Sequence, residues 1–124
     1  MTGFALDVAT VLRKAATVRI ETSAGDGRPV HRTIVWIVVD ETGRAFVRSH
    51  RGGRGRWYRE LIANPEGVVV VGPRRIPINA APADQAGIEV CSRLLSEKYA
   101  SSRASLASML RNEILETTLE LHPG

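Results

Sequence analysis

Residues 47–65 read VRSHRGGRGRWYRELIANP, and this stretch decides how we interpret the rest of the chain. An apolar strand pattern ends in a glycine-rich turn, and a short helix then carries Trp57 and Tyr58 and stops at Asn64-Pro65. Glycines let backbone N–H groups turn inward, and a helix N-terminus adds further donors and a partial positive charge. The stretch therefore predicts a strand, an anion-binding loop and a helix in succession.

Arginine strengthens that prediction. Six arginines fall between Arg44 and Arg59, and residues 42–59 contain no acid. The planar guanidinium matches phosphate oxygens in geometry and charge. Two other readings stay open: a solvated surface in a chain whose 17 basic residues include only two lysines, or a nucleic-acid contact. We favour a phosphate site.

Length and composition indicate one globular domain over residues 1–124. The net charge of +4 is uneven, since residues 28–75 hold ten arginines against four acids. A localised basic patch favours an anionic ligand. Cys91 is the only cysteine, which excludes an intrachain disulfide and favours a reducing, cytoplasmic location. No apolar run is long enough to span a membrane, and no signal-peptide pattern is present.

Hydrophobic periodicity predicts six strands and three or four helices. We expect Thr33–Val39, with Trp36 at its centre, to be the most buried strand, and Pro77 to mark an edge strand or a bulge. The expected strands cover residues 17–22, 33–39, 44–49, 67–71, 75–81 and 113–121. The expected helices cover 1–15, 83–100 and 104–111, besides the short helix that carries Trp57 and Tyr58 and stops at Asn64-Pro65.

Short connectors between these strands force antiparallel neighbours, and only residues 83–111 are long enough for a helical crossover. The element order predicts an α+β, mainly β fold: a six-stranded antiparallel β-barrel over residues 17–121 with flanking helices.

Residues for direct catalysis are not evident. His31, His50 and His122 lack metal-ligand spacing, so no metal site is expected, and no nucleophile elbow is present. The Arg51–Gly55 segment is not followed by the Gly-Lys-Ser/Thr of a P-loop. We predict no catalytic side chain, so any redox chemistry has to come from a bound cofactor.

The element order and several motifs resemble the FMN- and deazaflavin-binding split β-barrels, the relatives of pyridoxamine phosphate oxidase. The resemblance is strongest to the deazaflavin-dependent nitroreductase branch, whose members have a GRPR-type turn, a Gly-Gly loop and a helix of the form W-Y-x-N-L-x-A-N-P. This chain has Gly27-Arg28-Pro29, then Ser49-His50-Arg51-Gly52-Gly53, then Trp57–Pro65. The likeness covers residues 17–121 and implies a split barrel.

The resemblance also implies site residues. Arg51 stands in for the family's loop lysine and, with the N–H groups of Gly52 and Gly53, contacts the cofactor phosphate. Arg32 reaches the same phosphate or the ribityl chain, and Trp57 fixes the helix against the loop. The full set of expected cofactor-binding residues is Arg32, Ser49, His50, Arg51, Gly52, Gly53, Arg54, Arg56 and Trp57.

The implied cofactor is a deazaflavin coenzyme of the 8-hydroxy-5-deazaflavin type or FMN. The implied activity is hydride transfer to a small organic acceptor, and a homodimer is common in such barrels. Two alternatives stay open: a cofactor carrier of the same fold without turnover, and a nucleic-acid or acidic-partner binder that uses the arginine loop.

Overall fold

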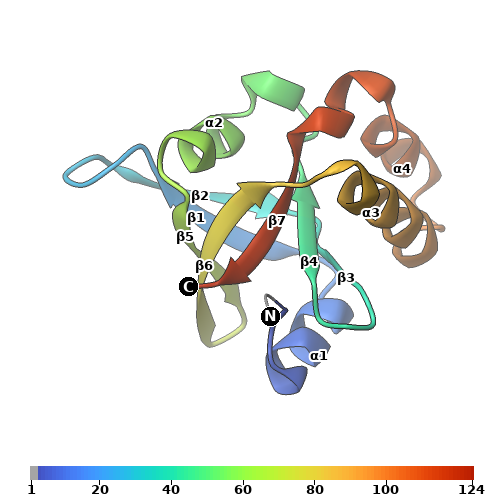
Figure 1. Cartoon of the computed structure of the whole chain (residues 1–124), viewed down its shortest axis with the longest axis horizontal. Coiled ribbons are helices and arrows are strands. Elements are labelled where there is room, and N and C mark those ends of the chain that lie inside the picture. Colours follow the sequence, from blue (N-terminus) through green and yellow to red (C-terminus); the bar gives the residue numbers. More distant parts are fainter. Residues whose placement is uncertain (1–2) are drawn as a thin grey trace.

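The computed structural model describes residues 3–124 and shows an antiparallel sheet that curls into a half-barrel, with helices outside it (Figure 1). The strands are β1 (Val18–Ser23), β2 (Val30–Val35), β3 (Val38–Val39), β4 (Ala45–Arg48), β5 (Glu66–Val71), β6 (Arg74–Pro82) and β7 (Thr118–Pro123). The helices are α1 (Leu6–Lys14), α2 (Arg56–Ala63), α3 (Gln85–Lys98) and α4 (Arg103–Met109), with short 3-10 helices at Gly52–Arg54 and Asn112–Thr117. The predicted α+β class is confirmed.

The strand order in the sheet is β2-β1-β5-β6-β7-β4-β3. The two edge strands, β2 and β3, are joined by only Trp36 and Ile37, so the sheet must curl to bring its two edges together. The barrel is therefore split where the chain passes from one edge to the other. This split positions the candidate site described below.

The prediction of six strands is wrong, because the expected strand 33–39 breaks at Trp36 and gives β2 and β3. Tertiary contacts cause the break. The Trp36 ring stacks on the Tyr99 ring at 3.8 Å between centroids, and the carbonyl of Ile37 accepts from Lys98 Nζ at 2.7 Å. These contacts replace the neighbours that a continuous strand would have.

The same segment is not the most buried strand either. On the edge strand β2, Ile34 is 63% exposed, and Trp36 is only half-buried. All four residues of β4 are buried instead, because β4 lies between β3 and β7 and is covered by α3. An apolar β-branched run therefore marked a sheet edge here.

The expectation for Pro77 is also wrong, since β6 lies inside the sheet between β5 and β7. Pro77 is opposite Val68 of β5, and its carbonyl accepts from Gly124 N at 3.0 Å, just past the end of β7. The nitrogen of a strand residue points to the same side as its carbonyl. Pro77 has no N–H to donate toward β7, but β7 has already ended at this position, so the sheet loses no hydrogen bond.

At the C-terminus, the expected strand 113–121 is corrected to β7, because residues 112–117 form a 3-10 helix. Thr117 Oγ1 donates to the Ile114 carbonyl at 2.7 Å, which stabilises that compact turn. Helices α1, α2, α3 and α4 lie in the segments where helices were expected, and residues 1 and 2 of the expected helix 1–15 are outside the described residues.

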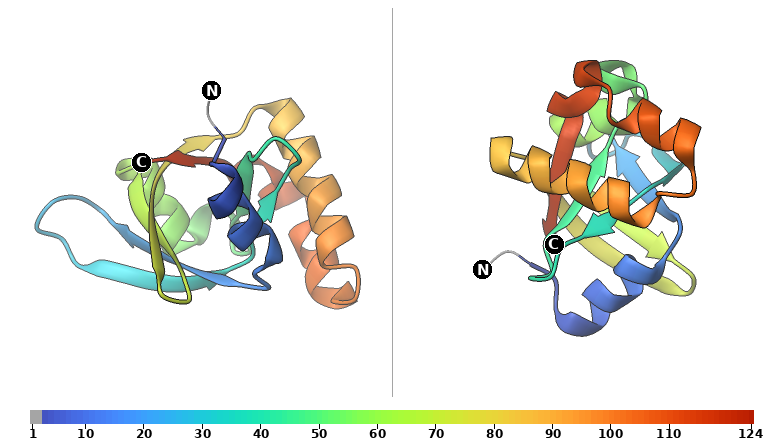
Figure 2. Two further views of the ribbon diagram at one scale, coloured as in Figure 1. Left: turned by 90° about the horizontal axis from the view of Figure 1, so that it is seen from below. Right: turned by 90° about the vertical axis from the view of Figure 1, so that its right-hand side faces the viewer.

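The core has two parts. The larger fills the barrel interior and includes Leu12 of α1 and Trp57 and Leu61 of α2, which lie one turn apart on one helix face. The smaller lies between the outer side of the sheet and the pair α3 and α4, around Phe46 and Cys91. Figure 2 shows α3 and α4 packed together on that side, and the β1–β2 hairpin extending from the body.

Candidate functional site

The glycine loop after β4 is folded tightly by its own hydrogen bonds. The buried Ser49 Oγ donates to the Gly52 carbonyl at 2.8 Å, and Gly52 N donates to the Ser49 carbonyl at 3.0 Å. Gly52 has φ of 61°, which favours glycine. A Cβ at Gly55 would collide with Ser49 Oγ. Glycine at these two positions therefore lets the loop turn directly into α2.

Helix α2 begins without a side-chain cap. Its N-cap is Gly55, whose carbonyl accepts from Arg59 N at 3.0 Å, so the N–H groups of the first turn have no intrahelical acceptor. These donors and the helix dipole make the start of α2 electropositive. The start of α2 therefore offers free N–H donors and a partial positive charge beside the loop.

Two hollows meet at the split of the barrel. The loop hollow, of about 300 Å³, lies at the start of α2 and is lined by Thr33, Ile34, Ser49, His50, Arg51, Gly55, Arg56 and Trp57. The inner hollow, of about 260 Å³, lies under α4 and is lined by Thr17, Ile34, Val35, Trp36, Arg48, His50, Trp57, Ser105 and Met109. Ile34, His50 and Trp57 line both, so the two hollows are neighbours that share a wall.

The arginine run that looks continuous in the sequence is divided in the structure. Arg44 forms a two-pronged ion pair with Glu120, at 2.8 and 3.0 Å. Arg48 is buried beneath α3 and α4. Only Arg51, Arg54 and Arg56 of the loop remain exposed, and none of the three forms an ion pair within residues 3–124. The loop hollow is therefore electropositive.

The structure brings most of the predicted site residues together. Ser49, His50, Arg51, Arg56 and Trp57 line the loop hollow. Gly52, Gly53 and Arg54 face a third, open hollow on the other side of the loop. Trp57 is also part of the barrel core and only 7% exposed.

Arg32 does not join them. Its guanidinium donates from Nε to Glu21 Oε2 at 3.0 Å on the side of the sheet that faces away from the core. Arg75 binds the same carboxylate at 2.7 Å, and the two arginines, Arg75 foremost, lower the pKa of Glu21 to about 2. Arg32 is thus held in a separate ion-pair cluster.

Sequence reasoning missed Arg111, which follows α4. Its side chain donates to the His50 carbonyl at 2.7 Å and lines the open hollow beside the loop. Nothing in its own sequence context links this arginine to a loop 61 residues earlier. Only the folded chain shows that α4 and the loop are tied together at this point.

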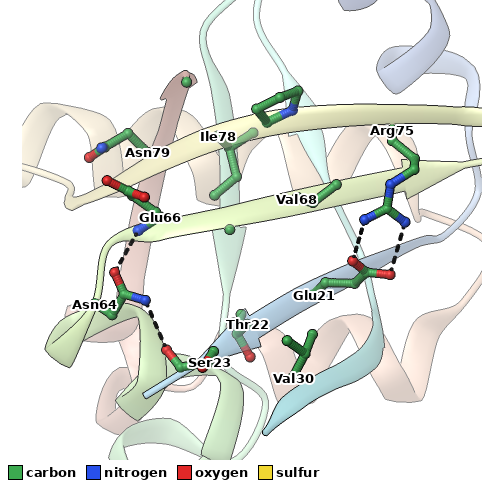
Figure 3. A pocket seen from close by; sticks show the side chains of 13 residues that line it. Glu21, Thr22, Ser23, Val30, Asn64, Glu66, Val68, Arg75, Ile78 and Asn79 are labelled. Carbon is green, nitrogen blue, oxygen red and sulfur yellow. Dashed lines mark hydrogen bonds and ion pairs between the residues drawn. The ribbon is translucent and has the colours of Figure 1, made fainter. Parts of the chain in front are cut away.

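A further concavity, of about 590 Å³, lies elsewhere, over β1, β5 and β6 (Figure 3). Figure 3 shows Glu21 paired with Arg75, while Asn64 donates to the Ser23 carbonyl. Glu66 adds a second carboxylate here. Because its only arginine is already paired and its carboxylates repel anions, this concavity does not suit a phosphate.

Other chemistry is not apparent in residues 3–124. No group of three or more His, Cys, Asp or Glu side chains is placed to hold a metal ion there. In the same described part, no helix has the length and apolar character needed to cross a bilayer.

The fold is the split β-barrel that the sequence motifs predicted, and it is shared with an F420-H2 dependent reductase and a putative pyridoxamine 5'-phosphate oxidase. The chain belongs to the family described as "Uncharacterized protein conserved in bacteria (DUF2255)", whose model matches residues 8–121. No curated protein matches it in sequence.

Three solved structures illustrate the shared fold. HutZ, the heme storage protein from Vibrio cholerae, has a TM-score of 0.65 at 13% identity, over 95% of this chain and 88% of HutZ. An F420-H2 dependent reductase (FDR-A) has a TM-score of 0.65 at 19% identity, over 86% of this chain and 94% of the reductase. A putative pyridoxamine 5'-phosphate oxidase from Listeria innocua has a TM-score of 0.61 at 13% identity, over 95% of this chain and 90% of the oxidase. At these identities the likeness establishes the fold alone.

Proposed function

We propose that this protein binds a phosphorylated flavin or an 8-hydroxy-5-deazaflavin-type coenzyme at the split of its barrel. The observation that carries the proposal is the loop hollow. There, Arg51 and Arg56, neither of them paired with an acid in residues 3–124, lie with the uncapped first turn of α2 around one cavity. Charge-assisted hydrogen bonds from such groups are the usual means of holding a phosphate.

The neighbouring surfaces suit a planar ring. Ile34, His50 and Trp57 form the shared wall of the two hollows, so a ligand whose phosphate lies at the loop can place its ring against apolar side chains. The strand that carries Ile34 is β2, an edge strand whose outer backbone groups are unpaired in the sheet. Such groups can bond the polar edge of a flavin-type ring.

A bound flavin or deazaflavin would supply hydride transfer to a small organic acceptor. The chain would contribute binding, orientation and partial exclusion of water. Of the three side chains that line both hollows, Ile34, His50 and Trp57, only His50 can exchange a proton. We leave Arg32 out of the proposed phosphate site, because Glu21 already holds its guanidinium.

The test includes two ligands, FMN and riboflavin, that differ only in the phosphate. Purified protein is titrated with FMN, riboflavin and a phosphorylated deazaflavin while tryptophan fluorescence is followed. We expect micromolar binding of FMN or the deazaflavin, and at least about tenfold weaker binding of riboflavin. Failure of both phosphorylated ligands at about millimolar concentration rejects the proposal. Binding without reduction of any acceptor would favour the cofactor-carrier alternative.

We also propose that a second copy of the chain covers the outward face of β2, β1, β5 and β6. Val30, at 65% exposed, and Ile34 are large apolar side chains on this face. Arg19 and Glu66 are exposed on the same face. A two-fold axis can place Arg19 of each copy opposite Glu66 of the other copy. The face thus combines exposed apolar side chains with charges of both signs that a second copy can pair.

Light scattering after size-exclusion chromatography tests this arrangement. The parent chain should be dimeric, and Val30→Glu should be monomeric. Ile62→Glu, at an exposed apolar position of α2, is the control and should stay dimeric. A monomeric parent at high concentration rejects the dimer.

A further inference from the structure

Arg48 is a buried cation that has no acidic partner in the described part of the chain. It is only 2% exposed. Its Nε donates to Thr118 Oγ1 at 2.8 Å, its Nη1 to the Met109 carbonyl at 3.0 Å and its Nη2 to the Ile88 carbonyl at 3.1 Å. Because a guanidinium has five N–H groups, two remain after these bonds.

Arg48 differs from the arginines that form ion pairs. The partly buried Arg44 has Glu120, and the exposed Arg32 and Arg75 share Glu21. The neighbouring thiol of Cys91 offers no counter-charge to Arg48, because burial raises the pKa of Cys91 to about 11. The charge of Arg48 is offset only by neutral oxygens, one of them at the C-terminal end of α4. Burying a cation without an anionic partner lowers the stability of the fold.

Arg48 also lines the inner hollow. The walls beside it are apolar and partly aromatic, with Trp36, Trp57 and Met109, while Ser105 of α4 is an exposed residue at the opening. The hollow thus combines one buried positive charge with flat apolar walls. This combination is typical of a site for a small ligand with an anionic group and an apolar body.

We propose that the inner hollow binds a small planar carboxylic acid, with Arg48 as the receptor of its carboxylate. The proposal rests on the proposed function in one respect: an acid bound here would be the acceptor that lies next to the cofactor ring. It names the substrate class as aromatic or unsaturated carboxylates. The inner hollow is less suited to a phosphate, because it offers a single arginine, whereas the loop hollow offers two arginines and a helix N-terminus.

The test uses benzoate and its neutral analogue benzamide, titrated without any cofactor. The chain has two tryptophans, and both line the inner hollow, so their fluorescence reports on binding there. We expect benzoate to bind at least about tenfold more tightly than benzamide. Since no cofactor is present, failure of this test leaves cofactor binding intact, and failure of the cofactor titration leaves this one standing.

Variants locate the carboxylate. Arg48→Gln should abolish the preference for benzoate, and Arg51→Gln should retain it. Because Arg48→Gln can fail to fold, Ser105→Glu gives an independent test at an exposed helix position. A carboxylate at this wall should weaken benzoate binding by repulsion and by competing for Arg48, so Ser105→Glu should bind benzoate about tenfold more weakly than Ser105→Gln, whose side chain has a similar size.

Three results would overturn the proposal: equal affinities of the parent for benzoate and benzamide, loss of the preference in Arg51→Gln, or identical behaviour of Ser105→Glu and Ser105→Gln. The second result would place the anion at the loop.

Discussion

Arg48 and Arg51 are three residues apart in the same arginine run, but their surroundings are opposite. Arg48 ends β4 inside the protein and donates to oxygens of α3, α4 and β7. Arg51 begins the glycine loop, is exposed and forms no ion pair within residues 3–124. A basic run therefore need not be one functional unit. The buried Arg48 organises the fold and faces an apolar hollow, and the exposed Arg51 is free to bind an external anion.

The largest difference should be in stability. Arg48→Ala removes three buried hydrogen bonds and leaves Thr118 Oγ1 and two carbonyls without their donor, so we expect a loss of about 3 kcal/mol. Arg51→Ala should change stability by less than about 0.5 kcal/mol, as for an exposed side chain. Urea denaturation of both variants measures the contrast. Similar losses of stability in the two variants would contradict the distinction between the buried Arg48 and the exposed Arg51.

Affinity should show the reverse order. A charge-assisted hydrogen bond is worth about 1.5–3 kcal/mol, so Arg51→Ala should weaken FMN or deazaflavin binding about tenfold or more while the melting temperature stays nearly constant. Arg59→Ala is the matched control, because Arg59 is an exposed arginine of the same run that lines neither hollow. Equal affinities in parent and Arg51→Ala would move the phosphate away from the loop hollow.

In the Glu21 cluster, which consists of Glu21, Arg32 and Arg75, the arginines are paired with a carboxylate. Arg75 and then Arg32 lower the pKa of Glu21 from 4.5 to about 2. A carboxyl with a lowered folded-state pKa stabilises the protein above pH 4.5, and this contribution is lost as pH falls toward 2. Because both guanidinium groups are more than half exposed, we expect only about 1 kcal/mol.

Glu21→Gln should therefore lose about 1 kcal/mol at pH 7 and almost nothing at about pH 2. Glu41→Gln, at an exposed carboxyl in the turn between β3 and β4, should have little effect at either pH. Denaturant unfolding at the two pH values provides the measurement. A pH-independent loss in Glu21→Gln would show that the contribution is packing and not charge.

The sequence predicted those parts of the structure that are set by nearby residues. The order of strand, glycine loop and α2 followed from local signals, and the structure confirms it. Arg48 and Arg51 could not be distinguished in this way, because each is an arginine close to a strand end. Their difference depends on α3 and α4, whose residues Ile88 and Met109 lie 40 and 61 positions later.

The same reason explains the wrong strand. Residues 33–39 have strand propensity throughout, but Lys98 and Tyr99 bind the Ile37 carbonyl from α3 and its C-terminal end and break the run. Pro77 likewise appeared to mark an edge, because the sequence does not show where β7 ends. Contacts between distant segments decided each of these points. The inner hollow, built from such contacts, was accordingly missed.

The smallest expected effect is that of salt on cofactor binding, and it separates a cofactor site from a nucleic-acid surface. Three exposed loop arginines, Arg51, Arg54 and Arg56, make some DNA binding at low salt expected in either case. Binding constants for duplex DNA fall with a logarithmic slope of about 0.9 per phosphate neutralised. Engaging three phosphates would therefore lower DNA affinity more than about 40-fold between 50 and 200 mM salt.

A cofactor with one phosphate should lose only about three- to fourfold over the same range. We expect FMN or deazaflavin binding to persist at physiological salt and DNA binding to disappear, as measured by fluorescence titration of each ligand at several salt concentrations. The double variant Arg54→Ala/Arg56→Ala should reduce the DNA slope by about two units. If DNA binds with submicromolar affinity at physiological salt and this variant abolishes that binding, the exposed loop arginines form a nucleic-acid surface. The buried Arg48 would be unaffected, because its guanidinium is bonded to Thr118, Met109 and Ile88 in either case.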